Sequence, residues 1–177
     1  MATTTSVAPP PPLTGDDAIA RVRELLPAFR SAMLLTHPIE GTEPHARPMG
    51  LVGDPATFGG SLFFFSDDRS RKIEEIGRHP RVSLVLQSDD AGRYLHFTGH
   101  AAVVEDRTRM RELYTPRQRT WFPDGLDDPH LALIRVDVDR AEFWDSPGGM
   151  LQVLAAFTKA VVTGRPGQSG DQGTLEL

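Results

Sequence analysis

The chain has 177 residues, a formal net charge of -5 and no cysteine. This length fits one domain, and the mildly acidic balance argues against a general nucleic-acid binder, which needs a basic face. The lack of cysteine excludes disulfides, iron–sulfur clusters and thiol nucleophiles. No apolar run in the sequence is long enough to span a membrane, and we expect a cytoplasmic protein.

The N-terminal residues 1–14 are rich in Thr, Ala and Pro and include a run of four prolines. They lack the positive charge and the apolar centre of a signal peptide, so we expect a disordered tail. The following residues predict a helix, because Ile19, Val22 and Leu25 recur at helical spacing behind acidic capping residues.

From residue 31 the sequence changes to short apolar segments divided by turns. Six or seven such strands, with helices in the connections, are typical of a closed antiparallel barrel. The strands follow one another too closely for a regular parallel α/β pattern. We therefore expect a mainly β fold with flanking helices, of the α+β class. The expected strands lie near residues 32–36, 47–52, 62–65, 82–86, 93–105 and 131–144.

One domain over residues 15–163 accounts for these elements. Residues 150–163 have the pattern of a last helix. Residues 164–177 are expected to form a flexible C-terminal tail.

An aromatic strand ending at Ser66 passes directly into a short charged helix, which is expected to end near Gly77. Three basic residues crowd the start of this helix: Arg69, Arg71 and Lys72. A helix macrodipole favours acidic residues there, and Asp67 and Asp68, expected as caps, offset only part of the conflict. This charge order indicates an anion such as a phosphate at the helix start. An ordinary turn with solvated basic side chains is an equal alternative.

Eight short motifs occur along the chain in a distinctive order and spacing. They are Ala46–Met49, Leu62–Ser66, Ser70–Lys72, Arg81–Val85, Phe97–Ala101, Trp121–Gly125, Asp127–Pro129 and Glu142–Asp145. Together they resemble the FMN-binding split β-barrels of the pyridoxamine 5′-phosphate oxidase-like superfamily, and within it the general stress protein 26 group. The resemblance spans residues 16–163. It implies a six- to seven-stranded antiparallel split β-barrel and a homodimer with flavin sites at the subunit interface.

The same resemblance implies where the flavin binds. The implied cofactor-binding residues are Arg47, Pro48, Met49, Phe65, Ser66, Ser70, Arg71, Lys72, Tyr94 and Trp121. The phosphate is held where the aromatic strand meets the helix, and Arg71 and Lys72 can give a dianion charge-assisted hydrogen bonds. Trp121 approaches the ring from the other subunit, with barrel closure or dimer packing as its alternative role.

Two departures from the oxidase proper speak against oxidation of a vitamin B6 phosphate. Val52 stands where the oxidase carries a lysine, and the segment after Trp144 has no counterpart of the oxidase's substrate-binding arginine and histidine. The stress-protein group is the closer match.

The resemblance therefore implies flavin-dependent redox chemistry on a small molecule. FMN is the expected cofactor, with FAD as the alternative, and a nicotinamide cofactor is the expected electron donor. No residue stands out as an acid or base, so a non-catalytic flavin sensor, store or stress buffer is a second hypothesis. A deazaflavin or haem ligand is a third. We expect no metal site, and His96 and His100, on one strand face, fit exposed polar positions better than ligands.

Overall fold

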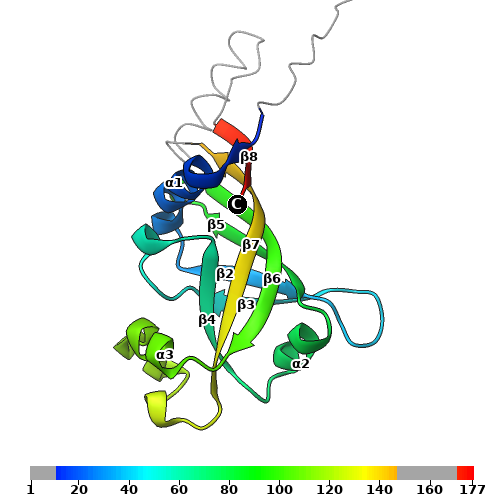
Figure 1. The fold of residues 1–177 in the computed structure, drawn as a ribbon, viewed down its shortest axis with the longest axis vertical. Coiled ribbons are helices and arrows are strands. Elements are labelled where there is room, and N and C mark those ends of the chain that lie inside the picture. The colour runs from blue at the N-terminus through cyan, green and yellow to red at the C-terminus, as the bar shows by residue number, and fades with distance from the viewer. Residues whose placement is uncertain (1–10, 147–170) are drawn as a thin grey trace, which may run out of the picture.

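The computed structural model describes residues 11–146 and 171–177, and its core is a strongly curved, mostly antiparallel sheet (Figure 1). The strands are β1 (Leu13–Thr14), β2 (Ser31–Thr36), β3 (His45–Gly50), β4 (Ser61–Asp67), β5 (Arg81–Ser88), β6 (Arg93–Val104), β7 (Leu131–Asp145) and β8 (Asp171–Glu176). The α-helices are α1 (Gly15–Leu25), α2 (Arg71–Arg78) and α3 (Arg107–Leu113). Short 3-10 turns are η1 (Leu26–Ala28), η2 (Pro55–Thr57), η3 (Pro116–Thr120) and η4 (Gly125–Asp127).

The long strand β7 organises the sheet because its two halves have different neighbours on one edge. Its first half pairs with β4 and its second half with β8, while β6 follows it along the other edge. The circuit β4–β7–β6–β5–β2–β3 then leaves a split between β3 and β4. Within the described residues this split is crossed by one isolated bridge, Val52 to Phe63. The expected split barrel is confirmed, whereas a barrel closed by continuous pairing is wrong.

A β-bulge marks the point where β7 changes neighbours. The pairing runs from Thr98 opposite Arg140 to Gly99 opposite Val138, so Asp139 is the additional residue on β7. Such a bulge bends a strand and increases its twist. The bend separates the half of β7 that pairs with β4 from the half that pairs with β8.

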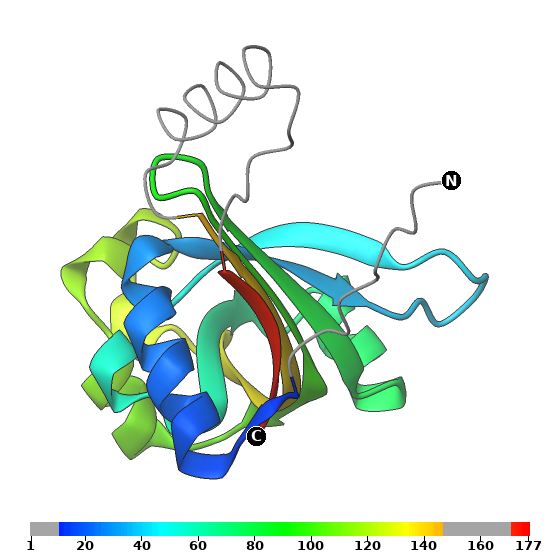
Figure 2. The ribbon, with the colours of Figure 1, turned by 90° about the horizontal axis from the view of Figure 1, so that it is seen from above.

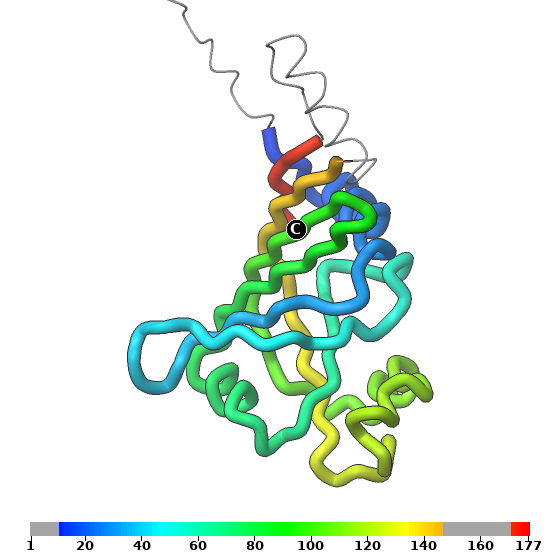
Figure 3. Tube along the Cα trace, turned by 180° about the vertical axis from the view of Figure 1, so that it is seen from behind, coloured from blue at the N-terminus to red at the C-terminus, as the bar shows by residue number. Residues whose placement is uncertain are grey.

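The core fills the inside of the curved sheet. Leu34, Leu84 and Phe97, from three neighbouring strands, are fully buried there. The helix α1 adds Val22 and Leu25 to the same cluster, as its apolar spacing predicts. A smaller cluster lies under α3 and contains Phe65, Met110, Leu113, Leu131 and Leu133. The β2–β3 hairpin projects away from this body, as Figures 2 and 3 show.

The six main strands predicted from the sequence are confirmed to within two residues at each end. The two expected tails need correction. Residues 13–14 form β1, and residues 171–176 form β8, which pairs with β7 and buries Leu175 completely. The helix expected at residues 150–163 lies outside the described residues. No helix in the described part of the chain is long and apolar enough to cross a bilayer.

Candidate functional site

A cavity of about 500 Å³ opens beside the split, a size that suits a small organic ligand. We call it the first cavity. It lies between β3, the end of β4, the start of α2 and the segment that follows α3. Its lining residues are Arg30, Ser31, Pro48, Met49, Gly50, Val52, Phe65, Ser66, Asp67, Lys72, Arg117, Gln118, Trp121 and Phe122.

One corner of the first cavity gathers hydrogen-bond donors. The Lys72 Nζ atom donates to Ser70 Oγ at 2.9 Å, and Ser70 Oγ lies 3.2 Å from Ser66 Oγ. Burial lowers the pKa of Lys72, and the nearby charge of Arg47 lowers it further. No carboxylate of the described residues lies within ion-pair distance of this ammonium group. The corner is therefore a half-buried positive charge beside two hydroxyls, which is a suitable environment for a phosphate.

The helix α2 starts later than the sequence indicates. Ser70 occupies the N-cap position, so the expectation that Asp67 and Asp68 cap the helix is wrong. Asp67 Oδ1 instead accepts from the Arg69 backbone nitrogen at 2.8 Å, and Asp67 Oδ2 accepts from Arg69 Nη2 at 2.7 Å. These bonds hold the pKa of Asp67 well below its usual range. The charge of Arg69 is thereby matched within its own turn, and of the three basic residues at the start of α2, Lys72 is the one that lines the cavity.

Glu75 forms a buried ion cluster behind this corner. Its carboxylate is fully buried and accepts from Thr36 Oγ1 at 2.5 Å and from Arg47 Nη2 at 2.9 Å. His45 Nδ1 lies 2.5 Å from the other carboxylate oxygen, and Arg71 Nε lies 3.1 Å from it. Burial on its own would raise the pKa of Glu75, but the hydrogen bonds from Thr36, His45 and Arg47 outweigh it and lower the pKa to about 2.

This cluster changes the roles expected for two arginines. Both were predicted to bind the flavin, Arg71 at its phosphate, yet neither Arg47 nor Arg71 lines the first cavity. Arg47 donates to Glu75 and also to Thr36 Oγ1. Arg71 is an exposed residue whose Nε faces Glu75. In this chain Arg47 joins the β2–β3 hairpin to α2 through Glu75, whereas Arg71 forms an i,i+4 ion pair within α2. Of the residues predicted to hold the phosphate with charge, Lys72 is the one that lines the cavity.

Most of the other predicted residues line the first cavity, and Tyr94 does not. Pro48, Met49, Phe65 and Trp121 line the first cavity together with Ser66 and Lys72. Ser70 reaches it through its bond to Lys72. Tyr94 does not line it, since its side chain is on the outer face of β6, with its hydroxyl 3.3 Å from Asp89 Oδ1. A role for Tyr94 at a flavin stays a prediction that would involve a second subunit.

Sequence reasoning missed Arg30, Arg117 and Gln118. Arg30 immediately precedes β2, and the other two lie on η3. A signal for η3 was present, because Thr115-Pro116 followed by Gln118 is a helix-start pattern. Gln118 Oε1 accepts from the Thr115 backbone nitrogen at 2.8 Å and from its hydroxyl at 2.6 Å.

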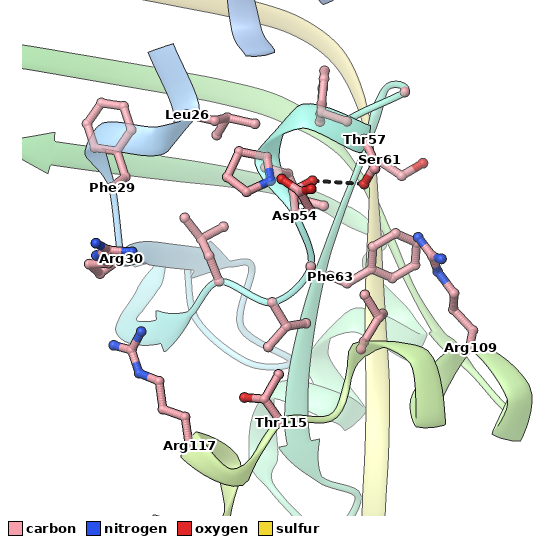
Figure 4. Close-up of a pocket in the computed structure, with 18 of the residues that line it drawn as sticks. Leu26, Phe29, Arg30, Asp54, Thr57, Ser61, Phe63, Arg109, Thr115 and Arg117 are labelled. Carbon is pink, nitrogen blue, oxygen red and sulfur yellow. Dashed lines mark hydrogen bonds between the residues drawn. The ribbon is translucent and has the colours of Figure 1, made fainter. Parts of the chain in front are cut away.

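A second cavity of about 420 Å³ adjoins the first (Figure 4). The two share Arg30, Val52, Arg117 and Gln118 as lining residues. The second cavity extends from this junction toward η2 and α3. Across residues 11–146 and 171–177, no group of three or more His, Asp or Glu side chains is placed to hold a metal ion.

The histidines of β6 are side chains on the outer face of the sheet. His96 Nδ1 lies 3.6 Å from Glu142, and His100 Nδ1 lies 3.2 Å from Asp139. Neither lines either cavity. This arrangement confirms the interpretation of both as partly exposed polar positions.

Comparison with known proteins decides the family. The profile of the family described as Pyridoxamine 5′-phosphate oxidase like matches residues 17–167. The chain belongs to this family. The family predicted from the sequence motifs is thereby confirmed.

Solved structures described as general stress proteins share the fold. A Jannaschia sp. CCS1 protein assigned to general stress protein 26 has a TM-score of 0.74 and 23% identity, covering 91% of this chain and 98% of that one. The general stress FMN/FAD binding protein of Xanthomonas citri has a TM-score of 0.62 and 26% identity, covering 74% of this chain and 90% of that one. These matches support the split barrel and the general stress protein resemblance.

A curated relative matches a smaller part of the chain. Protein bli-3 of Neurospora crassa is 26% identical over 116 residues, which are 61% of this chain and 56% of that protein. The chain thus spans little more than half the length of this relative.

Proposed function

We propose that this family member binds FMN in the first cavity and uses it for redox chemistry on a small molecule, with a nicotinamide cofactor as electron donor. The observation that carries the proposal is the half-buried Lys72 ammonium beside Ser66 and Ser70. The FMN/FAD binding named for the Xanthomonas citri protein supports it.

The residues present fit a flavin mononucleotide. Three cations line the first cavity, Arg30, Lys72 and Arg117, and its one carboxylate, Asp67, is matched by Arg69. The lining is therefore positive overall, as a phosphate dianion requires. Met49, Phe65, Trp121 and Phe122 provide an apolar and aromatic surface for a flat ring.

Bound flavin supplies hydride and electron transfer, while the protein supplies binding, orientation and electrostatics. Ser66, Ser70 and Lys72 would hold the phosphate at the start of α2. Trp121 has 68% of its surface exposed. Once a ligand or a second subunit covers this side chain, it would shield the flavin ring from water. FAD is the alternative ligand and would carry its phosphates to the same corner.

A non-catalytic flavin-binding protein is the second candidate. The titratable side chains that line the first cavity are Arg30, Asp67, Lys72 and Arg117. The pKa of Asp67 is well below its usual range, so this carboxyl group is not suited to proton transfer at neutral pH. Steady-state consumption of NADH and NADPH with several acceptors separates the two candidates. Turnover above that of equimolar free FMN supports the enzyme, and turnover equal to free FMN supports the binding protein.

Removal of the Lys72 ammonium group should weaken the binding of FMN but not that of riboflavin. Lys72→Ala should weaken FMN binding by about 10- to 150-fold, corresponding to ~1.5–3 kcal/mol for one charge-assisted contact. Riboflavin, which lacks the phosphate, should bind the variant and the unchanged protein equally well. Arg71→Ala should have a smaller effect on FMN, because Arg71 Nε faces Glu75. Titration calorimetry with both flavins measures all of these affinities.

The control for this test is Arg78→Ala, which removes an exposed cation of the same helix that faces Glu74 and does not line the cavity. An FMN affinity that falls as much in Arg78→Ala as in Lys72→Ala would indicate a general loss of positive charge. Equal losses of FMN and riboflavin affinity in Lys72→Ala would contradict the phosphate clamp.

We further propose that the protein is a homodimer that covers the outer face of the sheet. Met33 and Val85 lie directly opposite each other on this face and are 39% and 41% exposed. Tyr94 and Trp144 form a second such pair and are 40% and 43% exposed. Exposed large apolar pairs on a sheet are typical of an interface. A dimer would also bring Tyr94 near a second subunit.

Light scattering at micromolar concentration should give a mass near twice the 19.5 kDa of one chain. A Val85→Asp substitution should shift the protein toward the monomer, because it places a charge in the covered face. A monomer mass for the unchanged protein would refute the dimer.

A further inference from the structure

The second cavity adjoins the proposed flavin site and carries an unusual set of charges. Its charged lining residues are Arg30, Asp54, Arg109 and Arg117. The rest of the lining is largely apolar, and includes Phe29, Leu51, Phe58, Leu62, Phe63 and Leu113. A cavity with an apolar wall and an excess of positive charge suits an organic anion.

Two of the four charged groups are already engaged by neighbours. Asp54 Oδ1 accepts from the Ala56 backbone nitrogen at 2.9 Å, as the N-cap of η2. Arg109 Nη1 donates to Glu112 at 2.8 Å, and its guanidinium stacks 4.9 Å from the centre of the Phe63 ring. These contacts explain the positions of both side chains without a ligand.

Arg30 and Arg117 differ from that pair. Neither guanidinium has a hydrogen bond or ion pair with another described residue. Figure 4 shows both on one side of the cavity, opposite Arg109. Both residues line the two cavities, so they lie at the junction between them. Both residues are exposed, and an anion that lies between two such cations is attracted by both.

We infer that the second cavity is the substrate site for a small organic acid, whose anionic group is held between Arg30 and Arg117. The apolar part of this molecule packs against Phe29, Leu51 and Phe58. Arginine suits this role, because its planar guanidinium can form paired hydrogen bonds with a carboxylate or a phosphate. The inference rests on the proposed function for its chemistry, since the junction places the anion next to the flavin cavity. The binding itself requires no flavin.

Ligand-observed NMR with three probes tests this site. Benzoate, phenyl phosphate and the neutral benzamide are titrated into the full chain, with and without FMN. At least one anionic probe should bind at least about tenfold more tightly than benzamide. The preferred anion, benzoate or phenyl phosphate, identifies a carboxylate or a phosphate as the recognised group.

The Arg30→Gln/Arg117→Gln double variant should lose this preference, so that the anionic probe binds no better than benzamide. Arg119→Gln is the matched control, because Arg119 lies on the same η3 turn and lines neither cavity. It should keep the preference. A double variant that retains the preference overturns the inference, as does a protein that binds all three probes alike.

Parallel titration with FMN separates this inference from the proposed function. Arginine-dependent binding of an anionic probe to a protein that fails to bind FMN would support the acid site and refute the flavin proposal. FMN binding without any preference for anionic probes would refute the acid site alone. A loss of FMN affinity in the double variant as large as its loss of probe affinity would assign the two arginines to the flavin and overturn the inference.

Discussion

Glu75→Ala is expected to lower the free energy of unfolding by about 3–5 kcal/mol, because it removes the shared partner of a buried ion cluster. Arg47 and Thr36 donate to this carboxylate, and His45 and Arg71 lie against it. Without Glu75, the positive charge of Arg47 would remain half-buried beside Lys72 with no compensating anion. Urea unfolding followed by circular dichroism measures the change.

Glu74→Ala is the matched control for this prediction. Glu74 is the preceding residue on α2, and it forms an exposed i,i+4 ion pair with Arg78 at 3.2 Å. Because exposed pairs of this kind are weak, the control should change the unfolding free energy by at most about 0.5 kcal/mol. Equal effects at both positions would show that the buried cluster contributes no more than a surface ion pair.

The same carboxylate predicts how stability depends on pH. The pKa of Glu75 is lowered from 4.5 to about 2 in the folded protein, so the unfolded chain binds the proton more readily. The stabilisation is therefore complete above pH 4.5 and is lost as the pH falls from 4.5 toward 2. Its size is about 3 kcal/mol by the linkage relation. Over this pH interval the Glu75→Gln variant should lose less unfolding free energy than the unchanged protein. An equal loss in both proteins would contradict the lowered pKa of Glu75.

Gly99→Ala is expected to destabilise the protein by about 3 kcal/mol or more, since the bulge leaves no room for a side chain. A Cβ atom at this position would lie 2.1 Å from the Asp137 carbonyl oxygen and 3.0 Å from Val138 Cα. Both contacts are with backbone, so the β6–β7 ladder itself must move. That movement would disturb the place where β7 passes from β4 to β8.

Gly77→Ala provides the comparison, because a Cβ atom there meets nothing within 4 Å. Gly77 lies in the helix α2, where alanine is favoured over glycine by about 0.5–1 kcal/mol. This variant should therefore be as stable as the unchanged protein or slightly more so. Thermal melts give the melting temperatures of the two variants. Equal melting temperatures for Gly99→Ala and Gly77→Ala would refute the steric clash at Gly99.

The sequence was sufficient to predict the barrel strands because their apolar residues alternate in a simple way. Leu95, Phe97 and Gly99 alternate with more polar residues along β6, and all three are buried. The strand β8 was missed for the opposite reason. It reads Asp-Gln-Gly-Thr-Leu-Glu, and Leu175 is its one fully buried residue. A polar edge strand has no periodicity that distinguishes it from a tail, so its pairing with β7 depends on distant contacts.

The candidate site shows the same limit. The phosphate corner was predictable, since Ser66, Ser70 and Lys72 are close in sequence around one strand end. The ion pairs of Arg47 and Arg71 with Glu75 were not predictable, because they depend on the burial of Glu75 against the β2–β3 hairpin. Sequence periodicity does not reveal which charged residue of a short helix turns inward. The junction residues Arg30 and Arg117 are 87 positions apart and meet through tertiary packing alone.

We expect the first cavity to bind FMN through its phosphate at Lys72. The most direct test is titration calorimetry of the purified protein with FMN and with riboflavin, alongside its visible absorbance spectrum. The protein should show a flavin spectrum or take up one FMN per chain. Riboflavin should bind at least about tenfold more weakly, because it lacks the phosphate contacts. A colourless protein that releases no heat with FMN, or one that binds both flavins equally, would contradict it.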